Sequence, residues 1–195
     1  MRIVIAVAVG YLLGSIPFAL LLTRSRGVDL RHVGSRNVGA ANVLRTSGVA
    51  RAIAVMLLDA AKGAMAVVAA RLLTYDSVGV TTAGLAAIVG HIYPAWIGFR
   101  GGKGVAASAG VFAMLAPVAT VVAAVIFVGT IFITRFISAG SIAGAVALPV
   151  ATFAGDAPDP VVAGAVVAAI LVMHRHRENV ARLVAGTERR IGLRL

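Results

Sequence analysis

The sequence predicts an all-α integral membrane protein with seven transmembrane helices, some of them short or half-spanning. Of its 195 residues, 60% are hydrophobic and 13% are charged, about half the charged share of an average soluble domain. The hydrophobic residues form runs close to the length of about 20 residues that a helix needs to span a bilayer. The basic residues gather between these runs, as they do in cytoplasmic loops of membrane proteins. We therefore expect a single polytopic membrane domain over residues 1–195.

The charge balance narrows the range of partners. The chain has 18 Lys and Arg against 7 Asp and Glu, a net charge of +11. Because the bases lie next to apolar runs, anionic lipid headgroups are their expected neighbours. We expect neither a nucleic acid nor an obligatory protein partner. The absence of cysteine excludes disulfides, thiolate nucleophiles and thiolate metal sites.

The first apolar run covers residues 3–22. Only Arg2 precedes it, whereas residues 23–51 carry six arginines. This asymmetry predicts an N-terminus outside the cell and a first loop in the cytoplasm. No small-residue cleavage site follows the run, so we expect a transmembrane helix rather than a signal peptide. Pro17 should kink this helix, because proline lacks the N–H that a helix interior uses.

The second apolar run ends near Leu73 and is interrupted by Asp59 and Lys62. These two side chains are three residues apart, so they share one helical face and could neutralise each other. The short link at residues 74–77 adds no basic residue, which suits the outer side of the membrane. A third run, residues 78–99, then leads back to a basic, glycine-rich segment.

Residues 105–134 form an apolar stretch of thirty residues between Lys103 and Arg135. One crossing would place Arg135 and the basic tail outside. Two short crossings, broken near Ala116 and Pro117, keep every basic segment cytoplasmic. We therefore expect two crossings here.

Two further apolar runs, residues 140–153 and 161–173, flank an acidic turn that we place outside. The C-terminus is then cytoplasmic. The expected cytoplasmic segments are about 24–51, 98–105, 135–142 and the tail 174–195.

Residues 34–45 (GSRNVGAANVLR) are the first of three polar stretches on the predicted cytoplasmic side. Hydroxyl, amide and guanidinium donors are dense here, and the planar fork of Arg45 suits a phosphate. The alternative is a solvated loop whose asparagines cap turns.

The second polar stretch is residues 99–105, in which Gly101, Gly102 and Gly104 surround Lys103. Glycine lets backbone N–H groups crowd around an anion, and Lys103 adds a positive charge. The order of residues does not match a Walker A loop. A tight interhelical turn is the alternative interpretation, and His91, which precedes this stretch, is expected to be a structural histidine.

The third polar stretch is the tail, where His176 and Asn179 lie three residues apart and should share a helix face. A basic surface helix held by lipid headgroups is the alternative. Ser138 and Ser141 have the same spacing and could instead cap the following helix.

The chemistry missing from the sequence is also informative. No carboxylate pair, Ser-His-Asp order or metal-ligand cluster stands out. No His is followed five residues later by Asp, which argues against the common acyltransferases that use this pair. We expect no metal ion and no cofactor. The three polar stretches together suggest a site for phosphate groups attached to something lipophilic.

The motifs resemble those of the bacterial acyl-phosphate-dependent glycerol-3-phosphate acyltransferases. The resemblance runs nearly the full length, in the same order: residues 34–45, DAAKG (59–63), HIYPAWIGFRGGKGVA (91–106), SAGSI (138–142) and HRENVARLVAGTE (176–188). It implies a seven-helix enzyme of the cytoplasmic (inner) membrane of a bacterium, with a site that opens to the cytoplasm. Such an enzyme moves a fatty acyl group from acyl phosphate to the sn-1 hydroxyl of glycerol 3-phosphate. The products are lysophosphatidic acid and phosphate, in the first step of phospholipid synthesis.

The resemblance also implies roles for particular residues. Phosphate groups and glycerol hydroxyls would be held by the catalytic set: Ser35, Arg45, Lys103, His176 and Asn179. The remaining substrate-binding set would be Gly34, Asn37, Gly39, Asn42, Gly101, Gly102, Gly104, Ser138 and Ser141. Backbone amides around Gly101, Gly102 and Gly104, and around Gly39, would cradle phosphate and stabilise the oxyanion. The donor's own phosphate would accept the hydroxyl proton.

Arg36 and Ala41 depart from the family pattern, which usually has Gly and Thr at these two positions. Arg36 is either outside the left-handed region or strained there. Its guanidinium either points to lipid headgroups, the interpretation we favour, or reaches substrate. The alternatives for function are a divergent member with another acyl donor or acceptor, or a transporter or other phosphate- or lipid-binding membrane protein.

Overall fold

The computed structural model describes residues 1–24 and 27–192, and this part of the chain contains helices and no strand. The helices fall into two compact units, an N-terminal unit, Met1–Leu115, and a C-terminal unit, Ala116–Leu195. The N-terminal unit holds α1 (Arg2–Gly14), α2 (Phe18–Arg24), α3 (Ala40–Ser47), α4 (Val49–Leu73), α5 (Ser77–Ile92), the 3₁₀ helix η1 (Ala95–Ile97) and α6 (Val105–Leu115). The C-terminal unit holds α7 (Pro117–Thr134), α8 (Ile137–Ala154), α9 (Asp159–Arg175) and α10 (Arg177–Val184).

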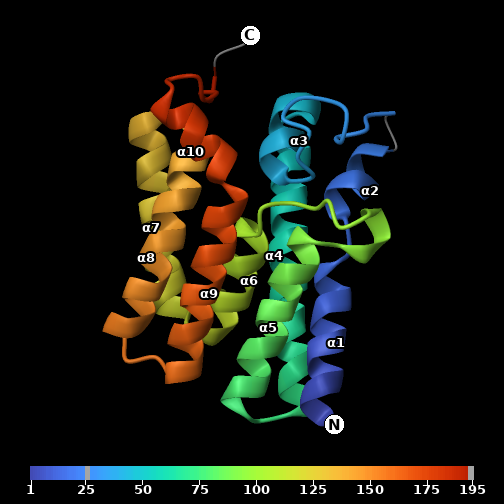
Figure 1. The fold of residues 1–195 in the computed structure, drawn as a ribbon, viewed down its shortest axis with the longest axis vertical. Coiled ribbons are helices and arrows are strands. Elements are labelled where there is room, and N and C mark those ends of the chain that lie inside the picture. The colour runs from blue at the N-terminus through green and yellow to red at the C-terminus, as the bar shows by residue number, and fades with distance from the viewer. Residues whose placement is uncertain (25–26, 193–195) are drawn as a thin grey trace. The chain divides into compact units, whose positions relative to one another are not determined.

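In the N-terminal unit, α1, α4, α5 and α6 pack as a bundle, with α3 against α4 (Figure 1). Small residues allow the close contacts, since membrane helices associate largely through van der Waals packing. At the crossing of α4 and α6, a Cβ on Gly110 would collide with the carbonyl oxygen of Ala60. Glycine at this position therefore lets the short α6 lie directly against α4.

Pro17 interrupts the first helical segment as expected. Helix α1 ends at Gly14 and α2 begins at Phe18, because the proline nitrogen cannot continue the hydrogen-bond ladder. The two pieces together still form a candidate membrane span, Arg2–Arg24.

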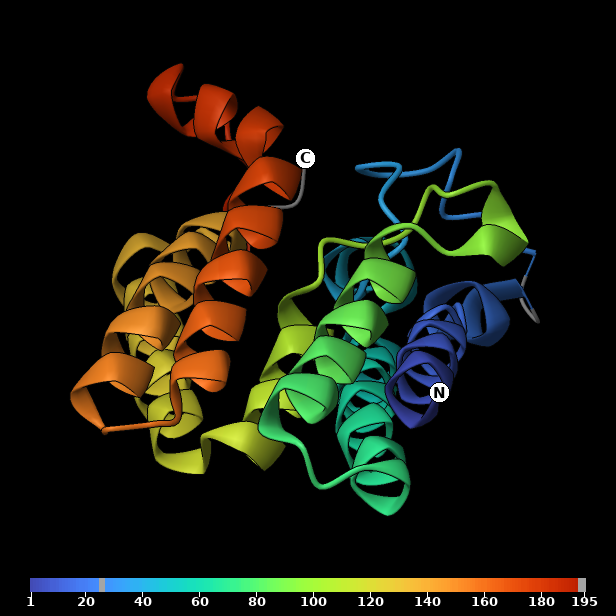
Figure 2. The ribbon, with the colours of Figure 1, turned by 60° about the horizontal axis from the view of Figure 1, so that its bottom comes forward.

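In the C-terminal unit, α8 packs against both α7 and α9 (Figure 2). Arg135 joins α7 to α8 in a left-handed conformation with φ 62°. At the C-terminal end of α9 the chain bends by 58° into α10. The predicted cytoplasmic segment 135–142 is mostly helical, because α8 already begins at Ile137.

Five helical segments within the described residues are long and apolar enough to cross a membrane, and the bent pair of α9 and α10 makes a sixth candidate. The predicted break near Ala116 is confirmed, since α6 ends at Leu115 and α7 begins at Pro117. However, the 11 residues of α6 rise only about 16 Å at 1.5 Å per residue, well short of a bilayer core. The structure thus supports a membrane protein with five or six candidate spans. Seven crossings and the orientation of the termini stay predictions.

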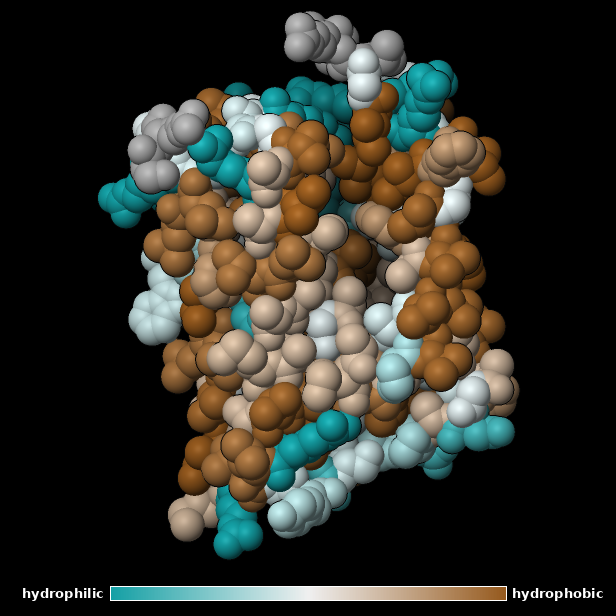
Figure 3. Space-filling view, turned by 180° about the vertical axis from the view of Figure 1, so that it is seen from behind, coloured by the Kyte–Doolittle hydropathy of each residue, from teal (hydrophilic) through white to brown (hydrophobic). Residues whose placement is uncertain are grey.

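The surface agrees with a membrane setting. Hydrophobic side chains cover the lengths of the helices, and hydrophilic ones gather around the helix ends (Figure 3). Among the exposed hydrophobic side chains, Leu57 of α4 is 59% exposed and Val125 of α7 is 66% exposed. In water such surface would favour aggregation, whereas lipid tails solvate it.

Candidate active site

The glycine-rich loop, defined as residues 98–104, follows η1 and leads into α6. It is fastened to the end of α5 by backbone hydrogen bonds: the N–H of Gly101 donates to the Ile92 carbonyl at 3.0 Å, and that of Gly102 to the His91 carbonyl at 3.1 Å. Both amides therefore donate into the protein in this structure. The predicted substrate-binding role of Gly101 and Gly102 stays a prediction.

Close packing explains why the loop needs glycine at position 102. A Cβ there would collide with Nε2 of His91 and would lie 3.0 Å from the Val38 carbonyl oxygen. Gly104 has a different requirement, since its φ of +89° is in the region that favours glycine. Its carbonyl accepts the Ser108 N–H at 2.8 Å and starts α6. Lys103, partly buried, is thus held between two fixed glycines.

A buried ionic cluster lies behind this loop, formed by Asp59 and Lys62 of α4 with His91 of α5. Lys62 Nζ is 2.8 Å from Asp59 Oδ1, and the two side chains are 3% and 4% exposed. The prediction that this pair shares a face and neutralises its charges is confirmed. His91 Nδ1 faces the same carboxylate oxygen at 3.5 Å. The three side chains line a small cavity together with Val38, Gly101 and Gly102.

The first polar stretch is organised around Asn42, which is 1% exposed. Its Oδ1 accepts the Ser35 N–H at 2.9 Å, and its Nδ2 donates to the Leu30 and Val33 carbonyls at 3.3 and 3.1 Å. The side chain predicted to bind substrate therefore fixes the loop that presents Ser35. Whether Asn42 also contacts substrate stays a prediction.

The rest of this stretch leads into α3. Gly34 has a φ of +62°, Gly39 is the extended N-cap of α3 and Arg45 lies in its last turn. Asn37 is partly buried next to Gly39, while Ser35 and Arg45 are exposed.

Arg36 adopts the left-handed conformation, with φ 56°. Of the two backbone alternatives considered for it, the strained one is therefore correct, at a cost of about 1 kcal/mol or more relative to a relaxed residue. The residue is exposed.

In the C-terminal unit, Glu188 collects three donors. Its Oε1 accepts from Ser138 Oγ at 2.9 Å and from Asn179 Nδ2 at 2.7 Å, and its Oε2 accepts from Arg182 Nε at 2.7 Å. Burial of the carboxyl favours its neutral form, but the bonds from Arg182, Asn179 and Ser138 outweigh it, so the pKa of Glu188 is lowered. Two predicted site residues, Ser138 and Asn179, are thus joined by a carboxylate that the sequence analysis did not select.

The side chains of His176 and Ser141 each lie within hydrogen-bond distance of the backbone carbonyl four residues earlier. His176, 2% exposed, lies at the bend between α9 and α10, with Nδ1 2.8 Å from the Val172 carbonyl oxygen. Ser141 Oγ donates to the Ile137 carbonyl at 2.9 Å. Neither Ser138 nor Ser141 caps α8, because the N-cap is Phe136.

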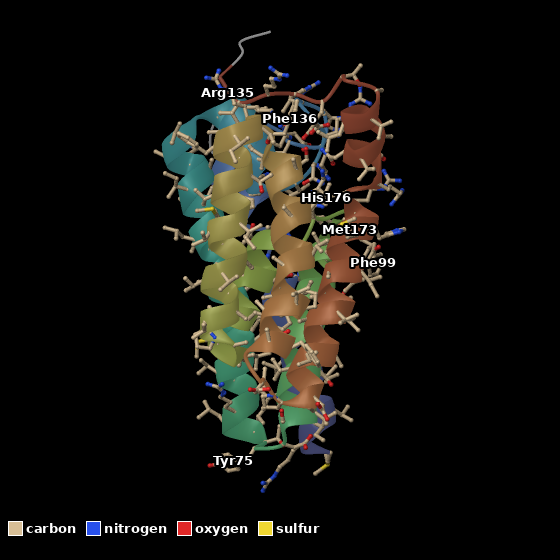
Figure 4. All side chains as sticks on the ribbon, turned by 90° about the vertical axis from the view of Figure 1, so that its left-hand side faces the viewer. Tyr75, Phe99, Arg135, Phe136, Met173 and His176 are labelled. Carbon is tan, nitrogen blue, oxygen red and sulfur yellow. The ribbon has the colours of Figure 1, made fainter. Side chains whose placement is uncertain are left out.

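Figure 4 shows Arg135, Phe136 and His176 toward the same end of this unit's helices. The tail reaches that end too, since Ile191 N–H donates to the Arg135 carbonyl at 2.8 Å. This bond links the basic segment just before α8 to the basic segment that follows α10. Both segments belong to the C-terminal unit.

Together, the long apolar helices and the arginine- and glycine-rich segments between them define an integral membrane protein. Within residues 1–24 and 27–192, no three His, Asp or Glu side chains gather as a metal site. A sequence profile described as Glycerol-3-phosphate acyltransferase matches residues 4–186. The chain belongs to the glycerol-3-phosphate acyltransferase family.

Individual proteins of this family are similar in sequence to this chain over almost its whole length. The glycerol-3-phosphate acyltransferase of Geobacter sulfurreducens is 45% identical, covering 95% of this chain and 96% of the relative. That of Mesorhizobium japonicum is 46% identical, covering 97% and 96%.

Solved structures agree as well. The crystal structure of PlsY (YgiH), an integral membrane glycerol 3-phosphate acyltransferase, in its glycerol 3-phosphate form has a TM-score of 0.94 at 38% identity, covering 98% of this chain and 96% of that one. The lysophosphatidic acid form of PlsY gives a TM-score of 0.92 at 36% identity, with the same coverage.

Proposed function

We propose that this chain transfers a fatty acyl group from acyl phosphate to the sn-1 hydroxyl of glycerol 3-phosphate, giving lysophosphatidic acid and phosphate. The observation that carries the proposal is the family match over residues 4–186, combined with a glycine-rich loop that is fastened to α5 and carries Lys103. The glycerol 3-phosphate and lysophosphatidic acid forms of the similar PlsY structure support the acceptor and the product. The acyl phosphate donor is the finer part of the proposal.

In the N-terminal unit, we assign the phosphate contacts to Arg45 and Lys103, with Ser35 as a hydroxyl donor. Arg45 offers a planar pair of N–H donors and Lys103 a point charge, both suited to phosphate oxygens. In the C-terminal unit, His176 and Asn179 have the same assigned role. The remaining substrate-binding positions in the proposal are Gly34, Asn37, Gly39, Asn42, Gly101, Gly102, Gly104, Ser138 and Ser141.

The proposed reaction needs little beyond positioning and charge stabilisation. The hydroxyl oxygen attacks the acyl carbon, the bond between that carbon and the phosphate oxygen breaks, and phosphate leaves. The hydroxyl proton passes to the donor's phosphate. Because an acyl phosphate is an activated mixed anhydride, holding the reactants in line and stabilising the oxyanion lowers most of the remaining barrier.

A donor comparison tests the proposal. Purified protein in detergent is given glycerol 3-phosphate with either an acyl phosphate or the matching acyl-CoA, and lysophosphatidic acid and phosphate are both measured. We expect one phosphate per lysophosphatidic acid with acyl phosphate, and no product with acyl-CoA. Product from acyl-CoA alone would identify a divergent donor, and no product from either would favour a phosphate-binding membrane protein or transporter.

We further propose seven crossings in the inner membrane, with the N-terminus outside and the motif loops cytoplasmic. The arginine distribution supports this topology. Since the chain has no cysteine, the substitutions Ser77→Cys, Asp159→Cys and Ala185→Cys each give a unique label site. An impermeant thiol reagent should label the first two in intact cells and not the third; the opposite pattern would overturn the topology.

A further inference from the structure

We propose that Asp59, Lys62 and His91 are positioning residues: they fix the glycine-rich loop and, through it, the place of Lys103. This inference rests on the proposed function, in which Lys103 holds a phosphate group. The three residues lie in α4 and α5, and none of them is among the residues assigned above to the substrate.

The first step is the anchoring of Lys62. Its Nζ donates to the Ile16 carbonyl at 2.8 Å and pairs with Asp59. Ile16 lies in the break between α1 and α2, and its carbonyl also accepts the Phe18 N–H at 3.1 Å. The Phe18 ring lies 5.8 Å from Lys62 Nζ, a cation–π distance. Lys62 is therefore engaged by the break between α1 and α2, by α2 and by α4, which makes it a structural cation and not a substrate contact.

The second step is the link from this cation to His91. Asp59 Oδ1 faces Nζ of Lys62 and Nδ1 of His91, at 2.8 and 3.5 Å. The carboxylate thus sets the orientation of an imidazole ring that is itself 7% exposed.

The third step is the link from His91 to the loop. The His91 carbonyl accepts the Gly102 N–H, and the ring edge leaves no room for a Cβ on Gly102. Backbone and side chain of one residue therefore fix the position directly before Lys103. A buried ion pair contributes little net stability, because desolvation offsets the attraction between the charges. Stability alone is therefore a weak explanation for this cluster.

A double-mutant cycle tests whether the cluster acts through Lys103. We expect His91→Ala to lower kcat/KM for glycerol 3-phosphate about tenfold, and Lys103→Ala to lower it about 10- to 100-fold. In the double variant the loss should equal that of Lys103→Ala alone within about twofold, because residues that act through one group are not additive. Multiplied losses would overturn the inference.

Lysine labelling supplies a second measurement that does not need activity. Lys62 and Lys103 are the two lysines of the chain, and Lys62 is 3% exposed. Mass spectrometry of protein treated with an amine-reactive reagent therefore reports the loop through Lys103. We expect His91→Ala to raise its labelling rate severalfold; an unchanged rate would contradict the proposal. If the unaltered protein lacked acyltransferase activity, the proposed function would fail while this measurement still tested the loop.

Two further variants guard against general effects. Thr81→Val on α5 is the matched control, because Thr81 is buried and its hydroxyl has no hydrogen-bond partner among the described residues. It should change neither kinetics nor labelling. If His91→Ala fails to fold, Asp59→Asn combined with Lys62→Gln removes both charges without leaving one unpaired. That double variant should give the same labelling increase and the same lack of additivity with Lys103→Ala, and the opposite results would overturn the inference.

Discussion

Both units bury a carboxylate, but Asp59 and Glu188 are held in different ways. Asp59 lies inside α4, and its cation, Lys62, comes from the same helix. Glu188 lies beyond α10 and gathers its donors from α8 and α10. The glycine-rich loop is fastened by backbone bonds and close packing, whereas the tail adds to its backbone bonds a set of side chains around one charge. The N-terminal unit should therefore be sensitive to added volume, and the C-terminal unit to lost charge.

The largest effect should come from Glu188→Ala, which leaves Ser138, Asn179 and Arg182 without their acceptor. Breaking a buried charged contact from one side costs about 3–5 kcal/mol, and we expect the lower end because the Arg182 side chain is 40% exposed. Thermal unfolding of the purified protein measures the change. As a control, Glu178→Ala removes an exposed carboxylate of α10 and should change stability by less than about 0.5 kcal/mol. Equal losses of stability in Glu188→Ala and Glu178→Ala would contradict the view that Glu188 holds the tail in place.

Gly102→Ala should produce the next largest effect. The added methyl group meets the His91 ring and the Val38 carbonyl, and overpacking of this kind costs about 1–3 kcal/mol. Because the loop shifts, acyltransferase activity should fall as well. Gly129→Ala in α7, where a Cβ meets nothing within 4 Å, is the control for the other unit. A harmless Gly102→Ala would show that the loop does not depend on this contact.

The stability that Glu188 gives to the C-terminal unit should depend on pH. The folded-state pKa of Glu188 is lowered from its ordinary value of 4.5, so its stabilisation is fully present above about pH 4.5 and is lost as the pH falls through the lower, folded-state pKa. Unfolding of the unaltered protein and of Glu188→Gln should thus differ most near neutral pH and converge in acid. A constant difference down to pH 3 would contradict the lowered pKa.

Arg36→Gly should have the smallest effect. Relief of the left-handed strain at Arg36 contributes about 1 kcal/mol, partly offset by the greater freedom of glycine in the unfolded chain. If the exposed guanidinium points to lipid headgroups, the KM for glycerol 3-phosphate stays unchanged. A tenfold rise, equal to about 1.4 kcal/mol of binding, would place Arg36 on the substrate instead.

Features set by local chemistry could be predicted from the sequence. The helix break at Pro17, the break between α6 and α7 at Ala116 and the Asp59–Lys62 pair follow from proline geometry and helical spacing. Each family motif is likewise a run of consecutive residues, so it could be recognised in the sequence.

Features set by long-range contacts could not be predicted in this way. Ser138 and Glu188 are 50 residues apart in sequence, so a lone carboxylate in an arginine-rich tail gave no signal of its partners. The amides of Gly101 and Gly102 turn inward because α5 ends beside them, which no glycine pattern specifies. The Asp59–Lys62 pair within an apolar run was predicted and signalled a buried polar cluster. Its contact with His91 of α5 was not predicted.

The most direct test of the account compares two cations of one loop, Lys103 and Arg100. Lys103 is held between fixed glycines and is assigned to phosphate, whereas Arg100 is exposed at the start of the same segment. Steady-state kinetics should show Lys103→Ala losing about 10- to 100-fold in kcat/KM for glycerol 3-phosphate, as expected for one charge-assisted contact. Arg100→Ala should stay within about twofold of the unaltered protein. Equal losses in the two variants, or a near-normal Lys103→Ala, would contradict the account.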